Sequence, residues 1–126
     1  MKPKIIVLCG SSRFCDIMAV CAWFLERDEG AIALDLHLLP SWYCKVADHL
    51  AESEGVAEAM DELHLRKIDM ADEVFVVNRD SYIGKSTERE VRYAMSLRKP
   101  IRWYTSDPIG VAVEKELRAA LKEVGK

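Results

Sequence analysis

The sequence predicts an α/β fold, a three-layer α/β/α sandwich around a parallel, flavodoxin-like or Rossmann-like sheet of four or five strands. Apolar runs at residues 4–9, 31–36, 74–77 and 101–104 are too short for helices and favour buried strands. The longer stretches that follow these runs carry apolar residues at helical spacing. Because strands that alternate with helices form a parallel sheet, we expect the strand order 2-1-3-4, with the topological switch point between the first and third strands.

The length and composition are typical of one soluble domain spanning residues 1–126. Half of the residues are hydrophobic, and the formal net charge is −3. No basic surplus indicates a nucleic-acid polymer as a partner. No apolar run approaches the roughly 18 residues that suggest a membrane-spanning helix, and no signal peptide opens the chain. We therefore expect a cytoplasmic protein that binds neither nucleic acid polymers nor membranes.

The cysteines of the chain do not form a metal-binding pattern. They show no CxxC pair and no histidine at zinc-finger spacing. We expect free thiols and no metal site. The four residues are Cys9, Cys15, Cys21 and Cys44.

The first strand leads into a loop, Gly10-Ser11-Ser12-Arg13, that could hold an anion. It offers a glycine turn, two hydroxyls and a guanidinium, which suit a phosphate or the hydroxyls of a sugar. It is neither a GxGxxG motif nor a P-loop. The alternative is a plain cap, with Ser11 or Ser12 at the N-terminus of a helix over residues 14–27.

Residues 38–45 follow the second strand and should therefore overhang the same edge of the sheet. Trp42 and Tyr43 in this segment could stack on a base. They could equally pack beneath a loop or at a contact between subunits.

Residues 47–70 predict one long helix or two short helices with a break near residues 53–55. Asp61, His64 and Ile68 are spaced i, i+3, i+7 and share a helix face. A lone histidine on such a face is often structural, so His64 is open to a structural or a functional interpretation.

The most informative stretch runs from residue 72 to residue 100. After the third strand comes a polar loop with Gly84, and Ser86 and Thr87 then stand where an N-cap is expected. The helix that follows should end at about residue 97, before Pro100. A strand, a glycine-containing loop and a helix N-terminus form the usual ligand site of an α/β sheet, and the helix dipole there favours an anion.

Glu90 is the strongest candidate for a functional residue in this helix. The helix should pack on the sheet through an apolar stripe that includes Val91 and Ala94, and Glu90 lies beside that stripe near the carboxyl end of the strand. Glu88 should face solvent. The structural alternative is that Glu90 merely complements the helix dipole in the first turn.

The last strand is followed by a predicted helix over residues 109–124. Its apolar residues recur at helical spacing and should pack into the core. They are Val113, Leu117, Ala120, Leu121 and Val124.

The segment ADEVFVVN…GKSTEREVRYAMSLRKPI resembles the signature of the nucleoside 2-deoxyribosyltransferase-like superfamily. This superfamily includes nucleoside deoxyribosyltransferases and the N-glycosidases that cleave (deoxy)nucleoside 5′-monophosphates. The shared pattern is AD, an apolar strand, a polar loop, Glu-apolar-x-x-Ala and Lys-Pro-apolar. The resemblance is specific over the opening loop and residues 61–101 and leaves residues 36–57 unmatched.

The resemblance implies roles for several residues. The nucleophile of the superfamily falls on Glu90, and the loop that holds the 5′-phosphate in nucleotide-cleaving relatives falls on Ser11, Ser12 and Arg13. Relatives often complete the site with a neighbouring subunit, which implies a homodimer or a larger homo-oligomer.

One position departs from the pattern of the superfamily. An aspartate seven residues before the alanine of AD assists the nucleophile in the superfamily, and counting back from Ala71 gives His64 instead. Three alternatives follow. His64 takes the role, Asp61 takes it with a shifted helix, or the chemistry differs.

We therefore expect an N-glycosidase that hydrolyses a (deoxy)nucleoside 5′-monophosphate. Glu90 would attack C1′ and form a glycosyl ester, as in retaining glycosidases, with no metal or other cofactor. The phosphate would lie at Ser11, Ser12, Ser86 and Thr87.

The alternatives are a deoxyribosyltransferase that exchanges bases, and a nucleotide-binding or sensor module without catalysis. A weaker third interpretation is a flavodoxin-like or response-regulator scaffold, and the sequence lacks the acidic cluster of the latter.

The run Gly84-Lys85-Ser86-Thr87 resembles the end of a P-loop, but the upstream glycine is absent, which excludes that motif.

Overall fold

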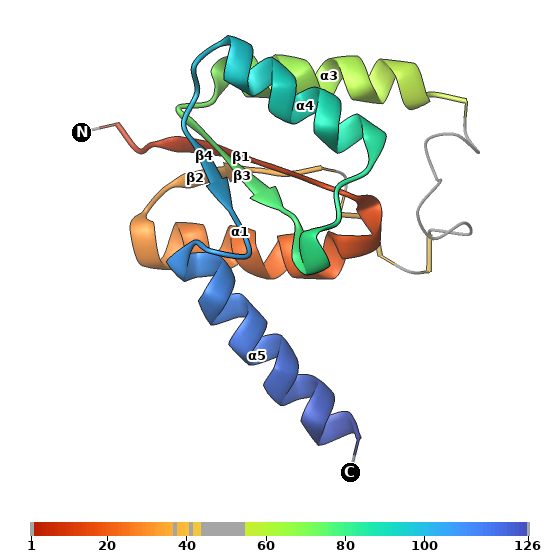
Figure 1. Cartoon of the computed structure of the whole chain (residues 1–126), viewed down its shortest axis with the longest axis vertical. Coiled ribbons are helices and arrows are strands. Elements are labelled where there is room, and N and C mark those ends of the chain that lie inside the picture. The colour runs from red at the N-terminus through yellow and green to blue at the C-terminus, as the bar shows by residue number, and fades with distance from the viewer. Residues whose placement is uncertain (1, 37, 41, 44–54, 126) are drawn as a thin grey trace.

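The computed structural model describes residues 2–36, 38–40, 42–43 and 55–125, and its arrangement is shown in Figure 1. Four parallel strands form one sheet in the order β2-β1-β3-β4, which confirms the predicted fold class and strand order. The bounds of the strands are Ile5–Gly10 for β1, Ile32–Leu34 for β2, Glu73–Val77 for β3 and Ile101–Trp103 for β4.

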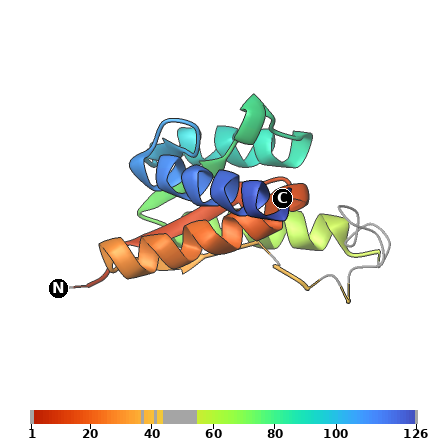
Figure 2. The same cartoon turned by 90° about the horizontal axis from the view of Figure 1, so that it is seen from below.

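Helices cover both faces of the sheet. One layer holds α1 and α5, which pack side by side, and the other holds α3 and α4 (Figures 1 and 2). The bounds are Cys15–Glu29 for α1, Ala57–Met70 for α3, Lys85–Ser96 for α4 and Pro108–Val124 for α5, with short 3-10 turns η1 at Ser12–Phe14 and η2 at Arg79–Ser81. These bounds match the predicted helices closely, except that the earlier part of the predicted helix 47–70 lies largely outside the described residues.

The two central strands alternate their side chains between two hydrophobic cores. Leu8 and Phe75 face the layer of α1 and α5, whereas Val7 and Cys9 face the layer of α3 and α4. All four side chains are fully buried, as expected for parallel strands covered on both faces. Cys9, the last residue but one of β1, therefore points toward α3 and α4.

The predicted cap of α4 is wrong, whereas the alternative interpretation of Ser11 as a cap is confirmed for the turn η1. The N-cap of α4 is Gly84, with extended backbone and no capping side chain, so Ser86 and Thr87 lie within the helix. Ser11 caps the turn η1, where its Oγ accepts a 3.3 Å hydrogen bond from the Arg13 N–H, and the N-cap of α1 is Phe14. The helices α1 and α4 therefore begin after Phe14 and Gly84, and not after the serine or threonine residues whose side chains suggested a cap.

The predicted core stripe of the last helix holds only for its first half. Val113 is buried, but Leu121 and Val124 are 57% and 84% exposed, and Ala120 is exposed as well. Figure 1 shows α5 running away from the sheet, so its second half lies beyond the core that covers its first turns. No helix among the described residues is long and apolar enough to cross a membrane.

Candidate functional site

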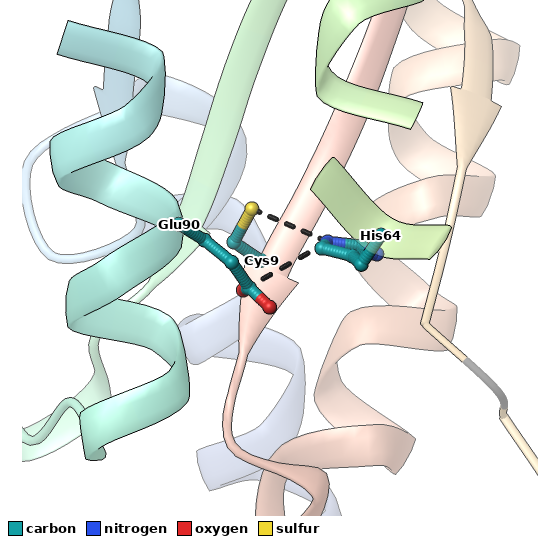
Figure 3. A group of neighbouring side chains, drawn as sticks. All are labelled: Cys9, His64 and Glu90. Carbon is teal, nitrogen blue, oxygen red and sulfur yellow. Dashed lines mark hydrogen bonds and ion pairs between the residues drawn. The ribbon is translucent and has the colours of Figure 1, made fainter. Parts of the chain in front are cut away.

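Three buried side chains from three separate elements meet between the sheet and the layer of α3 and α4 (Figure 3). Cys9 comes from β1, His64 from α3 and Glu90 from α4. The His64 Nε2 atom lies 3.4 Å from the Cys9 Sγ and 3.9 Å from the Glu90 Oε1. We call these three residues the Cys9–His64–Glu90 cluster.

Local structure explains why the three side chains converge. The alternation of β1 directs Cys9 toward α3 and α4. His64 shares the buried face of α3 with Ile68, four residues later. Glu90 shares the buried face of α4 with Val91 and Ala94. The sequence placed Glu90 beside the apolar stripe of this helix, and the structure shows that Glu90 is itself buried within that face.

The carboxyl group of Glu90 is held in an apolar position. The residue is 4% exposed, and Oε1 has no hydrogen-bond partner among the described residues. Burial, followed by the negative charge of Asp61, raises the pKa of Glu90 to about 8. The Cys9 thiol and the Arg89 guanidinium act in the opposite direction. A carboxyl with such a pKa can hold or release a proton near neutral pH.

The thiol of Cys9 has a still stronger bias toward its neutral form. Burial raises its pKa well above the usual value, and the negative charge of Glu90 acts in the same direction. Its 3.4 Å contact is with the ring of His64. Cys9 is therefore a protonated thiol at neutral pH when nothing else enters the cluster.

Asp61 lies at the rim of the same site. It precedes His64 by one turn on α3, its side chain is 36% exposed, and its Oδ2 lies 3.8 Å from the Arg89 Nη1 on α4. Both candidates for the assisting role thus face Glu90 from α3. His64 contacts Glu90 inside the protein, whereas Asp61 acts on it through its charge at the boundary with solvent.

The loops that follow β1 and β3 meet across the switch point, as the predicted topology requires. The Arg13 guanidinium carbon lies 4.0 Å from the centroid of the Tyr82 ring, and Phe14 contacts the same ring edge to face. A Cβ on Gly10 would lie 3.2 Å from Met18 and Val77, so this position favours glycine on steric grounds. The two loops therefore border one region of the surface.

The predicted phosphate ligands differ in their exposure. Ser12, Arg13 and Ser86 are exposed, and Ser11 and Gly84 are half-buried. Thr87 is 2% exposed, so its hydroxyl points into the protein. Glu88 is exposed, as predicted, and pairs with Arg92.

The aromatic pair predicted to stack on a base lies in a described segment of two residues. Trp42 is 83% exposed and Tyr43 is 43% exposed, with ring centroids 6.1 Å apart. Their role in binding stays a prediction. His37, Cys44 and His49 lie outside the described residues.

Two surface hollows in the described part of the chain lie away from the cluster. One is lined by residues 55–59, and the other borders Arg79, Tyr104 and Glu114. Neither hollow is lined by Glu90.

Cys9 is the member of the cluster that sequence reasoning did not identify. Cys9 lies near the end of an apolar strand, and nothing in the sequence distinguished it from the other three cysteines of the chain. Cys9 could have been found because it lies just before the Gly10 loop and because the alternation of the strand places its side chain on one defined face of the sheet.

Comparison with models of protein families and with curated protein sequences finds no match to this chain.

Proposed function

We propose that this protein is an N-glycosidase that hydrolyses a (deoxy)nucleoside 5′-monophosphate to a free base and a sugar 5-phosphate. The observation that carries the proposal is the position of Glu90. It is a carboxyl group at the carboxyl end of a parallel sheet, beside the switch point between β1 and β3, where α/β proteins bind ligands. The resemblance of its surroundings to the deoxyribosyltransferase-like signature supports the same role.

In the proposed reaction, the ionised Glu90 carboxylate attacks C1′ of the bound nucleotide. The N-glycosidic bond breaks with its electron pair leaving on the base, which takes a proton from a separate donor. A glycosyl ester of Glu90 forms through an oxocarbenium-like state. Water then attacks C1′ and gives one proton to the conjugate base of the donor, while the ester bond to Glu90 breaks. The sugar phosphate leaves, and the carboxylate is restored.

His64 and Asp61 are assigned positioning roles in this proposal. The imidazole of His64 lies 3.9 Å from Glu90 Oε1 and contacts the carboxyl group from inside the protein. Asp61 is the partly exposed group of the pair, and we assign it the contact with a sugar hydroxyl. After burial, its negative charge is the second cause that raises the pKa of Glu90.

The phosphate is assigned to the two loops that meet at the switch point. Arg13 supplies an exposed guanidinium there, and Ser12 and Ser86 supply exposed hydroxyls. The N-terminus of α4, which begins at Lys85, adds backbone N–H groups and its dipole. Thr87 has a buried side chain and contributes through its backbone at most.

A chromatographic screen tests the proposed function. The purified protein is incubated with each ribo- and deoxyribonucleoside 5′-monophosphate, with and without an acceptor base. We expect free base from at least one monophosphate without an acceptor. Base release that occurs only with an acceptor would replace hydrolysis by deoxyribosyl transfer.

A non-catalytic nucleotide-binding module is the second candidate, and the deep burial of Glu90 favours it. A carboxyl group that is 4% exposed can be a structural acid that never meets a substrate. In that case a nucleotide would raise the melting temperature of the protein and be recovered unchanged. Such a result would contradict the glycosidase proposal.

A further inference from the structure

We propose that the Cys9–His64–Glu90 cluster is a binding site for one transition-metal ion of the zinc class. The cluster offers a sulfur, an imidazole nitrogen and a carboxylate oxygen, all within 4.8 Å of one another. This inference goes beyond the proposed hydrolysis, which uses Glu90 without a metal.

The spacing of the three donor atoms fits a tetrahedral ion. Zinc binds sulfur at about 2.3 Å and nitrogen or oxygen at about 2.0 Å, which places neighbouring ligand atoms roughly 3.3–3.6 Å apart. The sulfur and nitrogen of Cys9 and His64 are 3.4 Å apart. The nitrogen of His64 and Oε1 of Glu90 are 3.9 Å apart, and all three donor atoms lie within 4.8 Å of one another. An inward movement of the Glu90 side chain would bring them to three of the four positions of a tetrahedral ion.

The carboxyl oxygen that faces the cluster is the second observation that favours an ion. The Glu90 side chain is 6% exposed, and its Oε1 atom is buried without a hydrogen-bond partner among the described residues. A buried polar oxygen without a partner costs free energy. An ion between Oε1, Sγ and Nε2 would supply that partner.

The donor set selects the class of ion. Thiolate and imidazole favour Zn²⁺ and Co²⁺, whereas Mg²⁺ and Ca²⁺ prefer sites made of oxygen alone. A Cys9 thiolate and a Glu90 carboxylate carry two negative charges, which balance a divalent ion inside the protein. Binding therefore displaces the proton of the thiol, together with the proton of Glu90 where that group is protonated, and tightens as the pH rises.

Metal binding would have a consequence for the proposed reaction. An ion that takes Glu90 as a ligand withdraws the carboxylate from attack on C1′. If the hydrolase function holds, the bound ion is an inhibitor whose removal by a chelator restores turnover. This consequence depends on the proposed function, whereas the metal site does not.

The test is a spectroscopic titration of the full chain, freed of metal by a chelator and kept reduced. With Co²⁺ as the probe, we expect one equivalent to bind and to produce a thiolate-to-cobalt charge-transfer band that Zn²⁺ abolishes by displacement. Mg²⁺ should leave the band unchanged. No band with wild-type protein would overturn the proposal.

Matched variants identify the thiol. Cys9→Ala should abolish the band, whereas Cys21→Ala should retain it, because Cys21 is equally buried but belongs to the other core. A band that persists unchanged in Cys9→Ala would also overturn the proposal. Circular dichroism checks that the variants are folded.

Variants of the other two ligands keep the test decisive if Cys9→Ala does not fold. His64→Gln and Glu90→Gln each remove one donor and should weaken Zn²⁺ binding at least tenfold in a competition titration. Unchanged Zn²⁺ affinity in both variants would exclude the cluster as the site. Because no nucleotide is present, a failure here leaves the glycosidase proposal untouched.

Discussion

The carboxyl group of Glu90 and the imidazole of His64 lie 3.9 Å apart on neighbouring helices, and both are almost completely buried. The pair lies beside a core of buried apolar residues from α3, α4 and β1, in which buried polar side chains are few. Buried acids with strongly displaced pKa values concentrate at functional sites. This pair is therefore the strongest candidate for a functional centre among the described residues.

Replacing Glu90 by Gln should separate activity from stability. Loss of the nucleophile should reduce base release by about a thousandfold or more, as removal of a catalytic nucleophile does in other enzymes. The free energy of unfolding should meanwhile rise relative to wild type at pH 9. The pKa of Glu90 is raised from 4.5 to about 8, so the wild-type fold is progressively penalised between these two values, and the amide is not.

Urea denaturation at pH 4 and pH 9 measures this difference, and we expect it only at pH 9. Glu88→Gln is the matched control, because Glu88 lies two residues before Glu90 on α4 and is exposed. Its turnover should match wild type. Near-normal turnover of Glu90→Gln would reject the assignment of Glu90 as the nucleophile.

The rate of base release by metal-free protein should rise with pH and level off above about pH 8. The attacking group is the ionised carboxylate, and the pKa of Glu90 is about 8, mainly because of burial. Charged or titratable neighbours are Cys9 on β1, His64 and Asp61 on α3, and Arg89 on α4. The acidity of Glu90 should therefore respond to substitutions among them.

Asp61→Asn should move this pH profile toward lower pH. The negative charge of Asp61 raises the pKa of Glu90, so its removal lowers that pKa and leaves more carboxylate at neutral pH. The plateau rate itself should fall if Asp61 also contacts the sugar. A profile that does not move would show that Asp61 and Glu90 are not coupled. Asp69→Asn, on the same helix but distant from the cluster, is the control.

Glu114 should contribute to stability above pH 4.5 and lose that contribution as the pH falls toward 2. The Arg79 guanidinium, followed by the hydroxyl of Tyr104 and by Arg118, lowers the pKa of Glu114 to about 2. A group whose folded-state pKa is depressed stabilises the fold only while it is ionised. Because the ion pairs are partly open to solvent, the effect at neutral pH should be on the order of 1 kcal/mol.

Denaturation of Glu114→Gln and wild type at several pH values measures this effect. The variant should be less stable at pH 7, and its deficit should shrink steadily between pH 4.5 and pH 2. Glu116→Gln, an exposed position on the same helix, should show no such trend. A deficit that is constant with pH would point to lost packing rather than to the charge of Glu114.

The exposed second half of α5 should form a contact between two copies of the chain. Leu121 and Val124 lie on one side of the helix, and both are largely uncovered. Sedimentation velocity should therefore find a homodimer, and Leu121→Glu should shift it toward monomer without loss of secondary structure. Lys122→Glu, at an adjacent exposed position, is the control for charge. A wild-type monomer at all concentrations would exclude this contact.

The sequence predicted the sheet because its strands and the helices between them depend on local patterns. Apolar runs and their alternation with helices are enough to set the strand order, and Glu90 is recognisable from the helix turn that follows β3. The cluster could not be predicted in full, because the approach of His64 to Cys9 depends on how α3 packs over β1. The helix α5 shows the same limit, since an apolar stripe indicates a face to be covered but not what covers it.

Arg13→Ala should weaken the recognition of the phosphate rather than the chemistry. Arg13 presents its guanidinium at the surface beside Tyr82, on the loop opposite the N-terminus of α4. Loss of a guanidinium–phosphate contact should raise KM for the monophosphate about tenfold or more, while kcat changes little. The corresponding free nucleoside, if it is cleaved at all, should be cleaved equally by both proteins. Arg92→Ala, an exposed site on α4 that pairs with Glu88, is the control. A fall in kcat for nucleoside and nucleotide alike would instead assign Arg13 to the shape of the site, because only a phosphate ligand distinguishes the two substrates.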